Sequence, residues 1–322
     1  MNEKAKIGDV LCQSLLALAK VDPDILAVTS DSRGSAALGP FVEALPAQLI
    51  EMGIAEQNAV TVSAGLAHSG KRPFVFSPAA FLTMRSIEQV KVDVCYSDTN
   101  VKLIGISGGI AYSDLGQTHH SLQDLAITRA LPNLEVYMPA DRVQAEALMT
   151  YLAHSVKPAY VRIGKVALPT IYSNDQEAFT APGKANLVKA DGDDVVLVAA
   201  GETVAIALAA AKRLANSGIG AKVIDLVSIK PIDSALLNAV ADRTKLFVTI
   251  EEHSVIGGIG SAVAEALAHR GDTRVEFVGF PDHPALAGSQ AAVFAHYGID
   301  DQDIAANVER WCSGGEARWH GM

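Results

Sequence analysis

Short apolar runs alternate with segments of helical periodicity through the first half of the chain, and this alternation constrains the fold more than any other feature. Each run has the length and composition of one buried strand: Ile25–Thr29, Pro73–Ser77, Val101–Ser107, Glu135–Met138 and Ala159–Ile163. Strands that are connected through helices pair in parallel, with the helices covering both faces of the sheet. The sequence therefore predicts a doubly wound α/β domain.

The periodicity breaks between Lys165 and Lys184, where Pro, Asn and Gly residues gather. Such a segment indicates a linker. Apolar strands and helices resume after it, and 322 residues are enough for two hydrophobic cores. We therefore predict two doubly wound α/β domains with mainly parallel sheets, over residues 1–167 and 185–322, joined by a linker over residues 168–184.

Composition and charge exclude several classes of protein. The mean hydropathy is +0.23, yet no apolar run reaches the roughly 18 residues of a membrane span. The first residues are polar, unlike a secretory signal, and the three cysteines are far apart without metal-ligand spacing, so we expect a reduced cytoplasm. A net charge of -10 argues against binding to nucleic acid or anionic membranes. It still allows a phosphorylated substrate, which needs only a local cluster of cations.

One acidic residue, Glu56, lies among small and apolar residues at the predicted start of a helix that continues to His68. A buried carboxylate without a partner is costly. The helix dipole alone favours an acid at this position. The alternative is a carboxylate that binds a heterocyclic nitrogen of a cofactor. The local sequence leaves both interpretations open.

The loops that follow the predicted strands hold further candidates, because ligands collect at the carboxyl ends of parallel strands. Asp31 and Ser35 follow the first strand, and Phe81 lies at a strand-to-helix turn. Phe76, inside a strand, fits ordinary core packing better. Arg162 and Lys165 flank the end of the last strand of this half, where they are either solvated or placed to bind a phosphate.

A glycine-containing loop after Ser107 carries His119 and His120 side by side. Consecutive histidines in such a loop are typical of a binding site, since loops on a rigid scaffold carry function. No acidic residue stands at metal-ligand spacing from them, so zinc is not expected.

Another glycine-rich run, Gly257–Gly260, follows Glu251–His253 between a predicted strand and a predicted helix. Its glycine spacing differs from the dinucleotide-binding pattern. We expect close packing of the helix on the sheet there rather than nucleotide binding.

Several motifs in order resemble transketolases: Gly53–Asn58, Ala80–Thr83 with Glu88–Lys91, Gly116–Ser121 with Arg129–Asn133, and Pro139–Asp141. The resemblance is to the carboxyl-terminal half of these enzymes, which in many bacteria is a separate subunit, and it covers nearly the whole chain. It implies a pyrimidine-binding domain of a thiamine-diphosphate enzyme followed by the transketolase C-terminal domain.

The resemblance also implies roles for the residues around the cofactor. Glu56 would hydrogen-bond the ring nitrogen of the aminopyrimidine and favour its imino tautomer, which prepares the thiazolium for attack on a ketose carbonyl. Phe81 would pack on the pyrimidine, with Phe76 or Arg85 beside it. Asp31 would lie near the thiazolium.

The substrate residues follow from the same resemblance. His119 would contact the sugar hydroxyls and assist proton transfer, and Ser35 and Arg162 would bind the substrate phosphate. Lys165 joins this group from its position alone.

Leu115 departs from the family pattern. Transketolases usually carry Asp-Gly-Pro-Thr-His where this chain has Leu115-Gly-Gln-Thr-His119. The missing aspartate normally contacts a hydroxyl of the donor sugar, and Asp114 is the candidate replacement. A less common substrate, such as a branched ketose phosphate, is therefore an open alternative.

The chain also lacks the Gly-Asp-Gly signature with a following Asn that binds Mg²⁺ and the diphosphate in this superfamily. We therefore expect an N-terminal transketolase subunit as the partner that holds both, in an α2β2 assembly. Two alternatives stay open: a subunit of another thiamine-diphosphate enzyme, similar to deoxyxylulose-phosphate synthase or to a 2-oxoacid dehydrogenase β subunit, and a non-catalytic assembly subunit.

Overall fold

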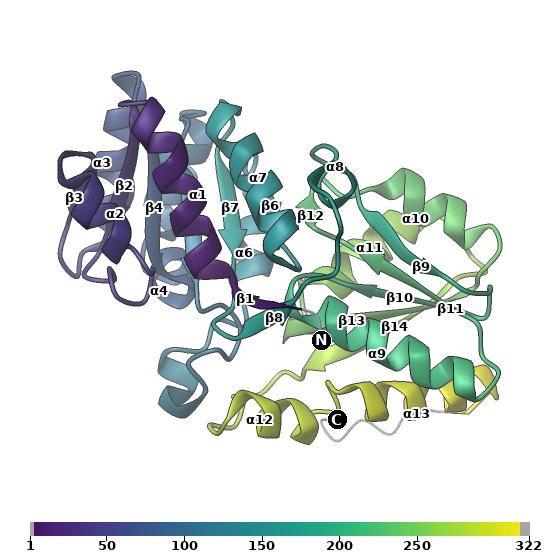
Figure 1. Ribbon diagram of the computed structural model, residues 1–322. Helices are drawn as coiled ribbons and strands as arrows, with labels where there is room; N and C mark the ends of the chain where they lie inside the picture. The colour runs from purple at the N-terminus through teal and green to yellow at the C-terminus, as the bar shows by residue number, and fades with distance from the viewer. Residues whose placement is uncertain (1–2, 316–322) are drawn as a thin grey trace.

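The computed structural model describes residues 3–315, which form two α/β lobes that lie side by side (Figure 1). We call them the N-terminal lobe, drawn in purple to teal, and the C-terminal lobe, drawn in green to yellow. No helix among the described residues is long and apolar enough to cross a bilayer.

A seven-stranded sheet forms the centre of the N-terminal lobe. In spatial order its strands are β12 (Ser228–Lys230), β6 (Glu135–Tyr137), β7 (Ala159–Arg162), β5 (Lys102–Ile106), β4 (Arg72–Pro78), β2 (Ile25–Thr29) and β3 (Leu49–Glu51). Every neighbouring pair is parallel except β12 with β6. The apolar runs predicted as strands are all present, because a strand buried on both faces reads as a continuous apolar run.

Helices cover both faces of this sheet. α1 (Ile7–Val21) and α7 (Arg142–His154) pack together on one face, and α3 (Glu56–His68), α4 (Ala79–Met84) and α6 (Asp124–Ala130) lie on the other (Figure 1). Shorter helices complete the lobe: α2 (Gly39–Ala44), α5 (Ile87–Gln89), the π-helix η2 (Val90–Tyr96), and the 3-10 helices η1 (Pro46–Gln48) and η3 (Ser113–Thr118). The segment from Ala79 to Tyr96 is divided among α4, α5 and η2.

A five-stranded sheet forms the centre of the C-terminal lobe. Its spatial order is β14 (Arg274–Phe280), β13 (Leu246–Ser254), β10 (Val195–Ala199), β11 (Ala221–Asp225) and β9 (Asn186–Ala190), with only β9 antiparallel. The helices are α9 (Glu202–Asn216), α10 (Ser234–Ala241), α11 (Ile259–Leu267), α12 (Gln290–His296) and α13 (Asp301–Cys312). The predicted fold class, α/β with mainly parallel sheets, is confirmed.

The two lobes share more structure than the sequence indicated. β12 comes from the second half of the chain but pairs with β6 in the first sheet. β1 (Lys4–Lys6) pairs with β8 (Ala167–Pro169), and α8 (Asp175–Ala178) lies inside the expected linker. One buried apolar cluster also includes Met138 of the N-terminal lobe and Val198 of the C-terminal lobe. A continuous core therefore joins the lobes.

The glycine run before α11 serves close packing, as expected. A Cβ on Gly260 would lie 2.2 Å from Cδ1 of Phe277. The Glu251 carboxylate accepts hydrogen bonds from the backbone N–H groups of Ile259 at 2.6 Å and Gly260 at 3.0 Å. Because this internal carboxylate already occupies the positive end of α11, a nucleotide phosphate would have to compete with it.

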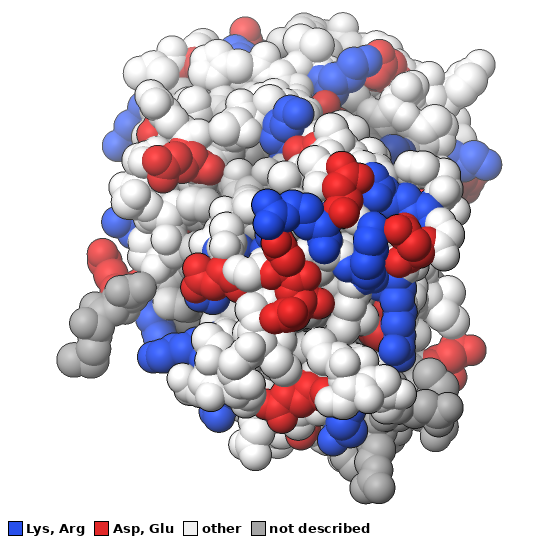
Figure 2. Space-filling view, turned by 90° about the vertical axis from the view of Figure 1, so that its right-hand side faces the viewer, with Lys and Arg blue, Asp and Glu red and all other residues white. Residues whose placement is uncertain are grey.

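Positive and negative side chains are mixed on the outer face of the C-terminal lobe (Figure 2). Ion pairs in this lobe join Lys245 with Asp272 at 2.7 Å and Arg243 with Asp193 at 2.7 Å. The charges of this face are therefore interspersed rather than gathered into a large field of one sign.

A substitution at Gly105 on β5 tests how tightly the sheet is packed below the loops at its carboxyl edge. A Cβ there would lie 2.3 Å from the hydroxyl oxygen and 2.7 Å from Cε2 of the buried Tyr160 ring. We expect Gly105→Ala to lower the free energy of unfolding by about 1–3 kcal/mol, since overpacking forces a buried ring to shift. Urea unfolding measures the change. The control is Gly65→Ala in α3, where a Cβ meets nothing within 4 Å; an equal loss in both variants would contradict the prediction.

Candidate functional site

The carboxyl ends of β2, β4, β5 and β7 meet at one edge of the N-terminal sheet, and most of the predicted site residues lie in the loops that begin there. Parallel pairing places these loops together although they are far apart in the sequence. This edge is the candidate functional site.

Glu56 begins α3 and is only 3% exposed. Small residues of the same helix, including Ala59 and Ser63, are buried beside it. Its Oε2 accepts from Nη1 of Arg85 at 3.0 Å, and the Arg85 side chain is 48% exposed. The buried carboxylate thus has one partner that solvent reaches, so both the helix dipole and a specific cation stabilise its charge.

A chain of ring contacts links this ion pair to the histidine loop. The Arg85 guanidinium lies 4.1 Å from the centre of the Phe81 ring, and Phe81 meets His119 edge to face at 5.2 Å between ring centres. His119 also contacts Tyr112 at 5.8 Å, and Lys165 Nζ lies 5.0 Å from the centre of the Tyr112 ring. The structure therefore brings together Glu56, Arg85, Phe81, His119 and Lys165 in one row, as the sequence predicted them to be neighbours in a site.

Of the two adjacent histidines, His119 faces the site. Its Nδ1 lies 3.0 Å from Oγ1 of Thr118. His120 is buried, and its Nε2 lies 3.4 Å from the carbonyl oxygen of Ser113. Burial lowers the pKa of His120, so the neutral ring is favoured. The second histidine supports the loop from within.

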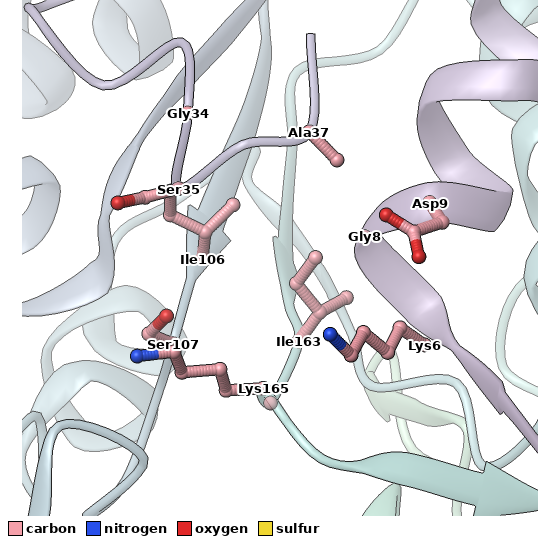
Figure 3. A pocket seen from close by; sticks show the side chains of 11 residues that line it. Lys6, Gly8, Asp9, Gly34, Ser35, Ala37, Ile106, Ser107, Ile163 and Lys165 are labelled. Carbon is pink, nitrogen blue, oxygen red and sulfur yellow. The ribbon is translucent and has the colours of Figure 1, made fainter. Parts of the chain in front are cut away.

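A cavity of about 150 Å³ opens next to this row (Figure 3). Ser35 after β2, Ser107 after β5 and Lys165 after β7 line it, and the start of α1 contributes Lys6 and Asp9. Lys165, whose ammonium group lies beside Ser107, and Lys6 contribute two cations to the lining, and Asp9 at the N-terminus of the 15-residue helix α1 contributes one carboxylate (Figure 3). The cavity is therefore suited to a small anion such as a phosphate group.

Residues with left-handed backbone conformations gather at this edge. Ala37 and Ser107, which line the cavity, have φ angles of 56° and 53°, and Asp31 has a φ of 52°. Such conformations are costly for residues other than glycine and persist where the surrounding structure fixes them. They support the assignment of this edge as a functional site.

Glu51 is a residue that the sequence analysis missed. Its Oε1 accepts from the backbone N–H groups of Asp31 at 2.7 Å and Gly53 at 3.1 Å, and its Oε2 pairs with Arg33 at 3.2 Å. It therefore ties the exposed loop of Asp31 to the segment before Glu56. Its local signal, an acid at the end of a three-residue strand, was too weak to recognise. Tyr112 was missed as well, although an aromatic residue in the histidine loop is itself a signal.

Two of the candidate site residues lie away from the open edge of the sheet. Phe76 is 1% exposed and lies opposite Ile104 in the apolar core, as its place inside a strand indicated. Arg162 is also 1% exposed, and its guanidinium lies among carboxylates rather than at the open edge of the sheet. The strand direction placed Arg162 correctly at a carboxyl end, but its side chain points into the junction of the lobes. Asp114 and Leu115 lie exposed in η3.

The environment of Arg162 is a buried ionic cluster. Its Nε lies 3.6 Å from Asp124 and its Nη2 lies 3.5 Å from Glu252. Burial opposes the charge, but the carboxylates of Asp124 and Glu252 outweigh it and raise the pKa of Arg162. Burial together with the neighbouring Glu252 raises the pKa of Glu202 to about 8. The protonated form of Glu202 is therefore favoured near neutral pH, which leaves Asp124 and Glu252 as the carboxylates that pair with Arg162.

The residues present fit a pyrimidine better than a metal ion. Residues 3–315 contain no group of three or more His, Cys, Asp or Glu side chains that could hold a metal. A buried carboxylate beside an aromatic ring, in contrast, matches the polar edge and the flat face of a heterocycle.

Comparisons with known proteins agree with this geometry. The family model of the transketolase pyrimidine-binding domain matches residues 3–170, and that of the transketolase C-terminal domain matches residues 183–304. The chain is 48% identical over 291 residues to one subunit of the apulose-4-phosphate transketolase of Phocaeicola vulgatus, covering 90% of this chain and 92% of the relative. It is 38% identical over 302 residues to the 6-deoxy-6-sulfo-D-fructose transketolase subunit SqwH of a Clostridium species, covering 94% and 93%.

Solved structures give the same result. A split-gene transketolase, described as an inactive β4 tetramer, superposes with a TM-score of 0.86 at 37% sequence identity, covering 97% of this chain and 99% of that chain. Because the two domain models match in order and the relatives match over nearly their full length, the chain belongs to the transketolase family, in which it carries the pyrimidine-binding and C-terminal domains.

Proposed function

We propose that this chain is the C-terminal subunit of a thiamine-diphosphate-dependent transketolase that transfers a two-carbon ketol unit between sugar phosphates. The observation that carries the proposal is the buried Glu56 carboxylate in one row with Phe81 and His119. The relatives named as subunits of transketolases for apulose 4-phosphate and for 6-deoxy-6-sulfo-D-fructose support the same activity.

The residues of the row have distinct roles. Glu56 would hold the ring nitrogen of the aminopyrimidine by a hydrogen bond to Oε1, since Oε2 is paired with Arg85. Phe81, whose ring lies under the Arg85 guanidinium, would pack against the pyrimidine. Asp31, in the loop after β2, would lie near the thiazolium. Thiamine diphosphate, when bound, supplies the carbon nucleophile that accepts and releases the two-carbon unit.

The other end of the row serves the sugar phosphate. His119 hydrogen-bonds the hydroxyls of the sugar and moves a proton at its ring nitrogen, a task for which an imidazole is suited near neutral pH. Ser35 and Lys165 bind the phosphate in the cavity, together with Lys6. Lys165 keeps the part that the sequence gave it, and Lys6 takes the part that the sequence gave to Arg162.

A partner subunit supplies Mg²⁺ and the diphosphate site. Exposed apolar side chains lie in this part of the lobe: Ile54, in the segment just before Glu56, is 75% exposed, and Tyr96, at the end of the η2 helix that packs against α3, is 83% exposed. Large exposed apolar patches mark interfaces. We propose that an N-terminal transketolase subunit covers this face in an α2β2 assembly. A solved relative described as an inactive β4 tetramer supports a need for the partner.

The sugar specificity centres on η3. Leu115 is 55% exposed there, in the position where transketolases usually have an aspartate, and Asp114 is beside it. Relatives in Phocaeicola vulgatus and Actinobacillus succinogenes are named as subunits of apulose-4-phosphate transketolases. We propose a less common ketose phosphate as the donor, with apulose 4-phosphate as the first to test.

A cytoplasmic location is part of the proposal, since Cys12, Cys95 and Cys312 are free thiols.

Another thiamine-diphosphate activity is the second candidate. The chain is 35% identical to a 1-deoxy-D-xylulose-5-phosphate synthase of Desulforudis audaxviator but spans only 48% of that protein. Turnover of pyruvate rather than ketose phosphates would favour it. A non-catalytic assembly subunit is the third candidate, which the calorimetric experiment below separates from both.

Calorimetric titration of thiamine diphosphate with Mg²⁺ tests the shared site. We expect no binding to the chain alone and binding to the chain combined with its N-terminal partner. Tight binding to the chain alone would contradict the shared site. Absence of binding to the combined subunits would favour the non-catalytic role.

Replacing Glu56 by Gln tests the activating role of the carboxylate. We expect at least about a hundredfold loss of ketol transfer with the partner present, because acid–base contributions are typically of this size or larger. The midpoint of urea unfolding should stay close to that of the wild type. Glu88→Gln, an exposed neighbour on α5, is the matched control. Ketol transfer at the wild-type rate in Glu56→Gln would refute the role.

Replacing Lys165 by Ala tests the proposed phosphate site. We expect Lys165→Ala to raise KM for a phosphorylated ketose by about tenfold, the loss of one charge-assisted contact, with little effect on a ketose without phosphate. Steady-state kinetics with both substrates measures the difference, and Lys212→Ala on the exposed face of α9 is the control. An equal change in KM for both substrates would show that Lys165 does not contact the phosphate.

A further inference from the structure

The loop formed by residues 108–122, which carries His119, is held at both ends by the C-terminal lobe. The backbone N–H of Ile110 donates to Oε1 of Glu252 at 3.0 Å, and the carbonyl of Leu122 accepts from the backbone N–H of Ser254 at 3.0 Å. The side chains of Ile110 and Leu122 are buried in the core cluster of the C-terminal lobe. The loop thus belongs to the first half of the sequence but is anchored in the second.

The base of the loop is narrow. Gly109 and Ser121 form an isolated β-bridge, with hydrogen bonds of 3.1 Å and 2.7 Å between their backbones. A third contact comes from the segment before α12, where the N–H of Gly288 donates to the carbonyl of Ser113 at 3.2 Å. Between these contacts, Asp114, Leu115 and Thr118 are exposed. The fixed ends therefore determine where the exposed part of the loop can lie.

Glu252 is the central side chain of this anchor. It is 1% exposed, and its Oε1 accepts from both Ile110 and the Nε2 of Gln290, the latter at 2.8 Å. Its backbone carbonyl accepts from Nη2 of Arg162 at 2.5 Å. A buried carboxylate with several donors has few alternative positions, because each lost hydrogen bond leaves an unsatisfied polar group.

Gly109 shows how closely the loop approaches Glu252. Its φ angle is 62°, and a Cβ at this position would lie 2.2 Å from Cδ of Glu252 and 2.4 Å from Nη2 of Arg162. The backbone of the loop is therefore packed directly on the carboxylate, with no space for a side chain between them. Such direct contact transmits a displacement of Glu252 to the loop.

We propose that Glu252, in the C-terminal lobe, is a positioning residue that fixes the loop of His119 for the sugar substrate. Glu252 touches neither the row of Glu56 nor the cavity; it acts through the backbone of Ile110 and the base of the loop. The catalytic consequence rests on the proposed function, since His119 must meet the substrate for its position to affect the rate. The C-terminal lobe then has a defined part in the reaction, as the support of the substrate loop.

The matched control is Glu202. It is buried in the same cluster and its Oε2 accepts from the same Nε2 of Gln290 at 2.9 Å. Its neighbour across the lobes is Gly164, whose Cβ would lie 1.1 Å from Oε1 of Glu202, rather than the loop of residues 108–122. Because Glu202 holds a proton near neutral pH, Glu202→Gln keeps the charge of the cluster.

Hydrogen exchange of the intact chain, followed on backbone amides of residues 110–121, tests the anchor without requiring activity. We expect Glu252→Ala to speed exchange in this segment by about tenfold, the effect of losing one hydrogen bond to a charged group, and Glu202→Gln to leave it unchanged. If Glu252→Ala does not fold, Glu252→Gln keeps an acceptor for Ile110 but loses the charge facing Arg162. Glu252→Gln should then raise the exchange rate of residues 110–121 by less than the tenfold expected for Glu252→Ala.

Kinetics with the partner subunit test the consequence for the reaction. We expect Glu252→Ala to raise KM for the ketose phosphate while the affinity for thiamine diphosphate, measured by calorimetry, stays unchanged. Wild-type exchange in a folded Glu252 variant, or equal acceleration in Glu202→Gln, would overturn the proposal, as would faster exchange without any change in KM or kcat. If the wild-type pair performs no ketol transfer, the proposed function fails, and the exchange comparison alone decides whether Glu252 fixes the loop.

Discussion

The buried charge of Arg162 is the constraint on which the arrangement of the two lobes depends. A guanidinium that is 1% exposed requires carboxylates, and it finds Asp124 in its own lobe and Glu252 in the other. Tyr160 donates to Oδ2 of Asp124 at 2.6 Å and so fixes one of these partners. Removing one member of a buried pair leaves an uncompensated charge, which costs far more than a surface pair contributes. The lobes are therefore held in one relative position.

This junction determines the geometry of the candidate site. The strand ends of the N-terminal sheet supply Glu56, Phe81 and the cavity, but the loop with His119 begins beside Arg162 and is bound by the C-terminal lobe. The contact between Phe81 and His119 thus joins a residue placed by the first sheet to one whose loop the second lobe supports. The site is built by both lobes although every residue named in it comes from the pyrimidine-binding domain, residues 3–170.

Much of this could be predicted from the sequence, because the relevant signals are local. Continuous apolar runs predicted the parallel strands, and Glu56 and His119 stood out by residue type against their surroundings. β3 and β12, at three residues each, carry too little periodicity to be recognised, and β12 joins a sheet formed by strands far away in the sequence. Glu51 and Tyr112 were missed for a similar reason, since their roles depend on contacts with distant segments.

The sequence by itself determined the fold class, the family and the residues at the carboxyl ends of the strands, because strand direction and residue type depend only on short stretches of sequence. Only the tertiary structure decided which of those side chains face the site. Arg162 is the last residue of β7 and Lys165 follows it three residues later, yet one is buried among carboxylates and the other lines a cavity. The difference comes from Asp124 and Glu252, whose positions depend on how the lobes pack and are not expressed in any local pattern.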